Sequence, residues 1–115
     1  MLKVLIADDE EKICQLIIKL INWEEMGLKI AATASNGIEA LEQAKICKPE
    51  ILITDIRMPG IDGMELIRKV KEKLPDTEII IISGYRHFEY AQTAIRYGVR
   101  NYLLKPIKKE ELRDT

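Results

Sequence analysis

The sequence predicts an α/β fold with a doubly wound, five-stranded parallel sheet, strand order 2-1-3-4-5, and helices on both faces. The main observation is that apolar runs rich in Val, Ile and Leu alternate with amphipathic helical segments along the whole chain. A second is that the runs at 51–54 and 79–82 lack charged residues. Such runs are typical of central parallel strands covered on both faces.

Each expected element follows from its hydrophobic period. Strands are expected where β-branched residues and leucines cluster, at 2–7, 28–34, 51–54, 79–82 and 101–104. Four helices are expected from apolar positions at helical spacing, namely Ile13, Leu16, Ile17, Leu20 and Ile21; Ile38, Leu41 and Ala44; Met64, Ile67, Val70 and Leu74; and Phe88, Ala91, Ala94 and Ile95. A fifth helix begins near Lys108 and is cut short at Thr115.

Size and charge bound the function. The 115 residues form one expected domain, 1–115, and the truncated last helix predicts that a C-terminal output domain is absent from this chain. Eighteen basic residues nearly balance nineteen acidic ones, so neither nucleic acid nor a membrane is expected as a direct partner. Cys14 and Cys47 do not have a metal-ligand spacing, Cys14 is expected to be buried, and no disulfide is expected. A cytoplasmic location fits this pattern.

Polar groups follow four of the predicted strands at the point where each ends. Asp8 and Asp9 follow the first strand and Asp55 the third, while Ser83 follows the fourth and Lys105 the fifth. In the predicted strand order the chain reverses direction between strands 1 and 3. Open α/β sheets bind ligands at the carboxyl ends of the strands beside such a switch point. The sequence therefore predicts a site at this edge.

The residue types at this edge suit a magnesium ion and a phosphoryl group. Acids after the first strand also suit helix capping, but a third carboxylate, Asp55, crowds like charges that a cation would neutralise. Mg²⁺ prefers such oxygen ligands. Asp55 is a candidate metal ligand or a nucleophile that forms an acyl phosphate. Ser83 can donate to a phosphoryl oxygen and Lys105 can neutralise its charge. Taken alone, each is more simply an ordinary cap or surface residue, and it is the joint arrangement that favours a site. The Lys105–Pro106 bond is open to either isomer.

Together these residues resemble the receiver domain of two-component response regulators, which has a flavodoxin-like fold. The resemblance rests on motifs spread over the whole chain, Val4-Leu5-Ile6-Ala7-Asp8-Asp9-Glu10, Asn36-Gly37 with Glu39-Ala40-Leu41, Asp55-Ile56-Arg57-Met58-Pro59-Gly60-Ile61-Asp62-Gly63, Ile82-Ser83-Gly84 and Leu104-Lys105-Pro106.

The resemblance implies a role for each site residue. Asp55 would be the phosphoacceptor, and Mg²⁺ would be held by Asp8, Asp9, Asp55 and the backbone carbonyl of Arg57. By the same resemblance, two further side chains, those of Ser83 and Lys105, would hold the phosphoryl oxygens. Catalysis would be limited to the domain's own phosphorylation and dephosphorylation, so an enzyme acting on metabolites is not expected.

The resemblance also implies a switch. Ser83 would move toward the phosphoryl group and Tyr102 would turn inward behind it, which changes the face formed by the fourth helix, fifth strand and fifth helix. The implied partners are a sensor histidine kinase, the protein's own output domain and a second copy bound through that face. The segments Asn22–Gly27 and Phe88-Glu89-Tyr90-Ala91 resemble receivers of AraC-type helix-turn-helix regulators, with DNA bound only by the missing output domain.

Other readings fit less well. A magnesium-dependent aspartyl phosphatase of the haloacid-dehalogenase type needs an acid two residues after its nucleophile, where this chain has Arg57. A flavin carrier of the same fold needs a hydroxyl- and glycine-rich loop after the first strand, where this chain has four acids. A stand-alone receiver, or a pseudo-receiver that works without phosphorylation, is the remaining alternative, although no expected acid is missing.

Overall fold

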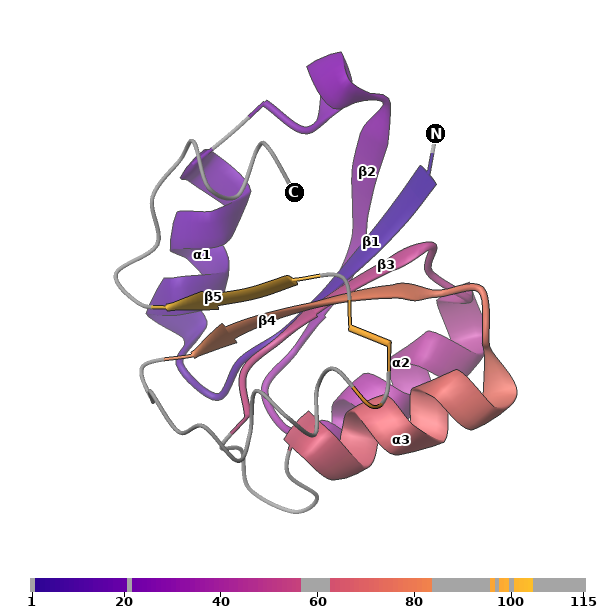
Figure 1. Cartoon of the computed structure of the whole chain (residues 1–115). Coiled ribbons are helices and arrows are strands. Elements are labelled where there is room, and N and C mark those ends of the chain that lie inside the picture. Colours follow the sequence, from indigo (N-terminus) through magenta and orange to yellow (C-terminus); the bar gives the residue numbers. More distant parts are fainter. Residues whose placement is uncertain are drawn as a thin grey trace.

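The chain forms a parallel sheet with helices on both faces (Figure 1). The computed structural model describes residues 2–20, 22–56, 63–83, 96, 98–99 and 101–104, and for Ser83 and 101–104 it describes the backbone. The elements are, in order, β1 (Leu2–Ala7), α1 (Glu11–Leu20), the 3₁₀ turn η1 (Glu24–Met26), β2 (Leu28–Ala34), α2 (Gly37–Cys47), β3 (Ile51–Thr54), α3 (Gly63–Lys73), β4 (Glu78–Ser83) and β5 (Asn101–Leu104). The predicted fourth and fifth helices lie outside the described residues.

The sheet has five parallel strands in the order β2-β1-β3-β4-β5, which confirms the predicted topology. Four strands have the predicted bounds, and β4 is one residue longer at each end than predicted. The apolar run of β4 is buried from Ile79 to Ile82, as expected for a strand covered on both faces.

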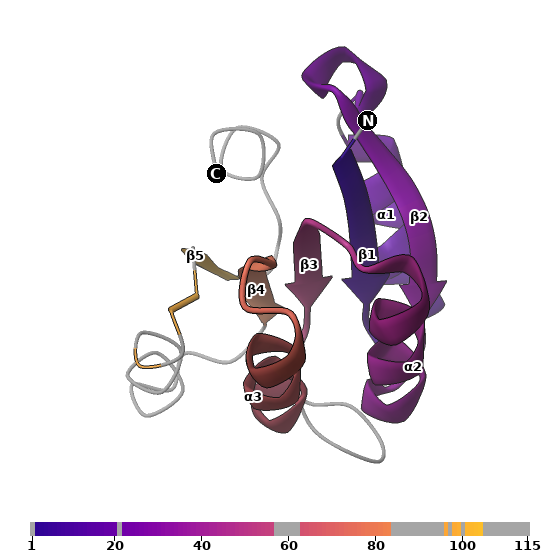
Figure 2. The ribbon, with the colours of Figure 1, turned by 90° about the vertical axis from the view of Figure 1, so that its right-hand side faces the viewer.

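Alternate residues of the strands pack into two separate cores, one on each face of the sheet. Leu5, Leu52 and Ile79 pack on the side of α2 and α3, whereas Val4 and Ile53 pack on the side of α1. Figure 2 shows the same arrangement, with α1 on one side of the sheet and α2 and α3 on the other. The period of two along each strand therefore delivers apolar side chains to both faces and fixes the strand register.

Two predicted core positions are wrong, and for one physical reason. Leu16 in α1 is 45% exposed, and Ile38 in α2 is 53% exposed. At 100° per residue, Leu16 points roughly 130° away from the mean direction of the buried Cys14 and Ile17. Ile38 is turned by a similar angle from the buried small residues of α2. Against the sheet, α1 buries the stripe that includes Cys14 and leaves Leu16 exposed. In the same way, α2 buries its small residues and leaves Ile38 exposed.

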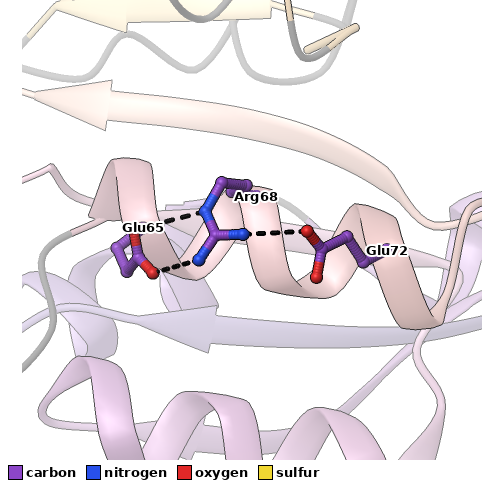
Figure 3. Close-up of polar contacts among 3 residues, drawn as sticks. All are labelled: Glu65, Arg68 and Glu72. Atoms are coloured by element: carbon purple, nitrogen blue, oxygen red, sulfur yellow. Dashed lines mark hydrogen bonds and ion pairs between the residues drawn. The ribbon is translucent and has the colours of Figure 1, made fainter.

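The predicted stripe of α3 is confirmed. Leu66, Ile67 and Val70 are fully buried, and Met64 and Leu74 pack partly buried against the same core. On the outer side of α3, Arg68 donates to Glu65 one turn earlier and to Glu72 one turn later, at 2.8 Å (Figure 3). The Arg68 guanidinium lowers the pKa of the Glu65 carboxyl. These exposed pairs contribute little to stability, so the buried stripe is what holds α3 on the sheet.

The connection from α1 to β2 carries the tryptophan. Trp23 is buried beneath the first helix, and its indole N–H donates to the Ile18 carbonyl at 3.1 Å. Gly27 ends η1 with a φ of 75°, a conformation that favours glycine. Cys14 is buried, as predicted, and Cys47 is partly buried; the two do not form a disulfide. None of the helices in the described part of the chain is long and apolar enough to cross a bilayer.

Candidate functional site

The sheet brings the first and third strand ends together. β1 and β3 are paired so that Ala7 lies opposite Thr54, and the next residues are Asp8 and Asp55. The Asp55 amide donates to the Ala7 carbonyl at 3.0 Å, which continues the ladder to the end of both strands. Asp8 is 2% exposed and Asp55 is 5% exposed. Two carboxyl residues are thus buried side by side at the predicted switch point, an arrangement that is costly without a compensating cation or hydrogen bonds.

An acidic cluster begins at Asp8. One carboxylate oxygen from each of Asp8, Asp9 and Glu10 lies within 4.8 Å of the others, with Asp8 buried and the other two exposed. Asp8 Oδ1 accepts a hydrogen bond from the Glu10 amide at 2.9 Å, and the Glu10 carbonyl accepts from the amides of Ile13 and Cys14. The acids therefore also organise the start of α1, as the capping interpretation expected. Carboxylate oxygens at this spacing form a donor set that suits Mg²⁺.

Glu10 is an addition to the predicted ligand set. Its carboxylate joins the cluster because the chain turns between the end of β1 and the start of α1. The run of consecutive acids from Asp8 to Glu11 was a visible signal, but the sequence does not tell which members of such a run face one point.

Asp55 is held from two directions at the end of β3. Its Oδ1 accepts from the Ile56 amide at 2.6 Å, and its backbone carbonyl accepts from the Thr54 hydroxyl at 2.9 Å. Both groups belong to the peptide unit that joins Asp55 to Ile56. The carboxylate orientation therefore depends on the position of this one peptide plane.

The fourth and fifth strands end at the same edge. Ser83 closes β4 and pairs with Leu104 at the end of β5, so the backbone leads directly to Lys105. Tyr102 pairs with Ile81, two residues before that edge. Lys105 and Arg57 lie outside the described residues, as do the side chains of Ser83 and Tyr102, so their predicted roles stay predictions.

Two cavities lie at opposite ends of the sheet. One, of about 280 Å³, is lined by Asp8 and by residues from α1, β2 and α2, including Cys14, Ser35 and Glu39. A larger one, of about 560 Å³, is lined by Trp23, Leu28 and Ile30 at the opposite end of the strands. The larger cavity is lined by one acid, Glu24, and by none of the clustered acids at the end of β1, so the candidate site is the edge next to the smaller cavity.

Comparison with known proteins decides the family. Residues 4–115 match the response regulator receiver domain. The chain belongs to the response regulator receiver family. A solved receiver domain of AraT, a response regulator from Geobacillus stearothermophilus, superimposes with a TM-score of 0.93 at 45% identity, covering 98% of this chain and 88% of that one.

Several curated relatives of this receiver domain are named as transcriptional regulatory proteins. It is 45% identical over 112 residues to the uncharacterized transcriptional regulatory protein YesN of Bacillus subtilis, covering 97% of this chain and 30% of the relative. It is 39% identical over 112 residues to the transcriptional regulatory protein HptR of Staphylococcus aureus, covering 97% of this chain and 44% of that relative. The chain thus spans less than half the length of these relatives.

Proposed function

We propose that this receiver domain takes a phosphoryl group from a sensor histidine kinase onto Asp55 in a reaction that requires Mg²⁺. The observation that carries the proposal is the pair of buried carboxyl residues, Asp8 and Asp55, on neighbouring strand ends of a receiver-family chain. A carboxylate oxygen of Asp55 attacks phosphorus and forms the P–O bond of an acyl phosphate. The bond from phosphorus to the donor atom breaks, and the leaving group keeps its electron pair.

The other site residues are proposed to serve that transfer. Asp8 and Asp9, with Asp55 and the Arg57 carbonyl, would bind Mg²⁺, which neutralises phosphoryl charge when bound. The acidic cluster at Asp8 and Asp9 supports this assignment. Ser83 and Lys105 would hold phosphoryl oxygens, which fits the end of β4 and β5 at the same edge. Catalysis is confined to the domain's own phosphorylation state.

The output is proposed to be transcriptional. Movement of Ser83 toward the phosphoryl group, followed by Tyr102, would reshape the face around β5 and so signal to a C-terminal output domain or to a second copy. The longer transcriptional regulators among the relatives support an output domain, of AraC type by the sequence resemblance, that alone contacts DNA. A cytoplasmic location follows from this role.

Incubation with acetyl phosphate and Mg²⁺ tests the proposal. Intact-mass measurement should show one added phosphoryl group on the wild type, none with EDTA, and none on Asp55→Asn, which keeps the side-chain shape but removes the nucleophile. Asp76→Asn, the same change at an exposed acid away from the site, should be modified like the wild type. An unmodified, folded wild type would refute the proposal and favour a pseudo-receiver.

The fluorescence of Trp23 is not a suitable reporter of metal binding, because this residue lies far from the acidic cluster. Trp23 lies at the start of β2, where Leu28 pairs with Leu2, whereas Asp8 follows the far end of β1. Six residues of β1 separate the two positions, or about 20 Å along the strand. Titration calorimetry with Mg²⁺ is therefore the direct measurement, and absence of any Mg²⁺ affinity would refute the metal part of the proposal.

A further inference from the structure

The first residue of α3 lies unusually close to the phosphoacceptor's backbone. Gly63 is buried, and its amide donates to the Ile56 carbonyl at 2.5 Å, which joins the start of α3 to the residue after Asp55. A Cβ atom built on Gly63 would lie 2.1 Å from the Asp55 carbonyl oxygen and 2.7 Å from Ile56 Cα. Real Cβ atoms stay beyond about 3.0 Å, so any side chain at this position displaces backbone.

Position 63 requires glycine because there is no room for a side chain, and not because of its backbone conformation. Gly27 and Gly98 have φ values of 75° and 72°, and a Cβ on either would meet nothing within 4 Å. Gly63 is not among the described residues with positive φ. Its backbone conformation is therefore open to any residue, and only the approach to Asp55 and Ile56 excludes a side chain.

We infer that Gly63 is a positioning residue for Asp55, an inference that rests on the proposed phosphoacceptor role. The Asp55 carbonyl that a Cβ would strike and the Ile56 N–H that donates to Asp55 Oδ1 belong to one rigid peptide plane. To restore a 3.0 Å contact, the Asp55 carbonyl and the start of α3 must separate by about 0.9 Å. The hydrogen bond from Gly63 to Ile56 ties α3 to this strand end, so the Asp55–Ile56 peptide plane moves. That movement carries the N–H with it and turns the carboxylate away from its present orientation.

A second contact on the same plane makes this movement costly. The Thr54 hydroxyl donates to the Asp55 carbonyl at 2.9 Å, and both groups are buried. Thr54 therefore holds the plane from one side while Gly63 allows α3 to close against it from the other. In-line phosphoryl transfer depends on position to better than 1 Å, and a misplacement of that size lowers rates by about 100-fold.

Gly63→Ala tests the inference, with Gly27→Ala as the matched control. Phosphorylation rates with acetyl phosphate are measured by intact mass at saturating Mg²⁺, below the unfolding temperature of every variant. Gly63→Ala should be modified about 100-fold more slowly than the wild type. Gly27→Ala, which is strained but strikes nothing, should keep the wild-type rate even where it lowers the unfolding temperature. The fluorine NMR spectrum of the beryllofluoride adduct should change for Gly63→Ala alone.

Thr54→Val keeps the test decisive if Gly63→Ala does not fold. It retains the side-chain shape but removes the hydroxyl that holds the Asp55 carbonyl, and it should slow modification by about two- to tenfold. A wild-type rate in folded Gly63→Ala, or in folded Thr54→Val, would overturn the inference. An unmodified wild type would instead refute the proposed function, so the two failures are distinguishable.

Discussion

Asp8→Asn should make the metal-free domain more stable. Asp8 is buried, and carboxylate oxygens of Asp9 and Glu10 lie within 4.8 Å of its own. Two unit charges at 4.8 Å repel by about 0.9 kcal/mol in bulk water and by about 3.5 kcal/mol at an effective dielectric constant of about 20. Because one partner is buried and the others are exposed, we expect a gain of about 1–3 kcal/mol in the free energy of unfolding.

The substitution keeps a hydrogen-bond acceptor for the Glu10 amide. The amide oxygen of the new side chain can still accept from the Glu10 N–H that Asp8 Oδ1 accepts from at 2.9 Å. In excess Mg²⁺ the wild type should become the more stable of the two proteins, because only the wild type binds the ion with its full ligand set. A ligand at 100 times its dissociation constant adds about 2.7 kcal/mol of stability. Asp8→Asn should gain much less from the same concentration of Mg²⁺.

Urea unfolding in EDTA and in excess Mg²⁺ measures both effects. Asp76→Asn serves as the control, since it removes an exposed charge away from the cluster and should change stability by less than about 0.5 kcal/mol in either condition. An Asp8→Asn variant that is less stable than the wild type in EDTA would refute the reasoning from charge crowding. Equal stabilisation of both proteins by Mg²⁺ would contradict the assignment of Asp8 as a ligand.

Two further predictions concern the fold. Ile17→Ala, in the core under α1, should lower the free energy of unfolding, measured in urea, by about 2–5 kcal/mol. Leu16→Ala, on the exposed side of α1, should lower it far less. The opposite ranking of the two variants would contradict the observed docking of α1. The Lys3 amide lowers the pKa of the Glu50 carboxyl below its ordinary value near 4.5. The ionised Glu50 carboxylate therefore stabilises the folded state at a pH above that value, and this stabilisation is lost as the pH falls through the pKa of Glu50 in the folded protein. The wild type should exceed Glu50→Gln in stability at neutral pH, and urea unfolding should show the difference shrinking as the pH falls below that ordinary value. A difference that does not change with pH would refute this.

Much of the site could be predicted from local patterns. The carboxyl end of each of these parallel strands is marked in the sequence by the first acidic residue after a run without acids, as at Asp8 and Asp55. Strand order then follows from general rules of chain reversal and handedness, and the observed sheet agrees. These features need no knowledge of long-range contacts, which is why sequence reasoning found them.

Features that depend on docking could not be predicted in the same way. The hydrophobic period places Leu16 and Ile38 near an apolar stripe, but the rotation of each helix about its axis is chosen by packing against the sheet. Small residues such as Ala40 allow close approach, and the helix turns toward them at the expense of a larger side chain. Exposure of these side chains is therefore decided by tertiary structure.

By itself the sequence determined the alternating elements, their order and the residues at the strand ends, because these follow from short-range periodicity and turn chemistry. Only the tertiary structure decided that Glu10 joins the acidic cluster and that Gly63 meets the backbone of Asp55. The first depends on how the chain turns between β1 and α1, and the second on how closely α3 lies against the end of β3. That placement is set by close packing of the whole core, which no local pattern encodes.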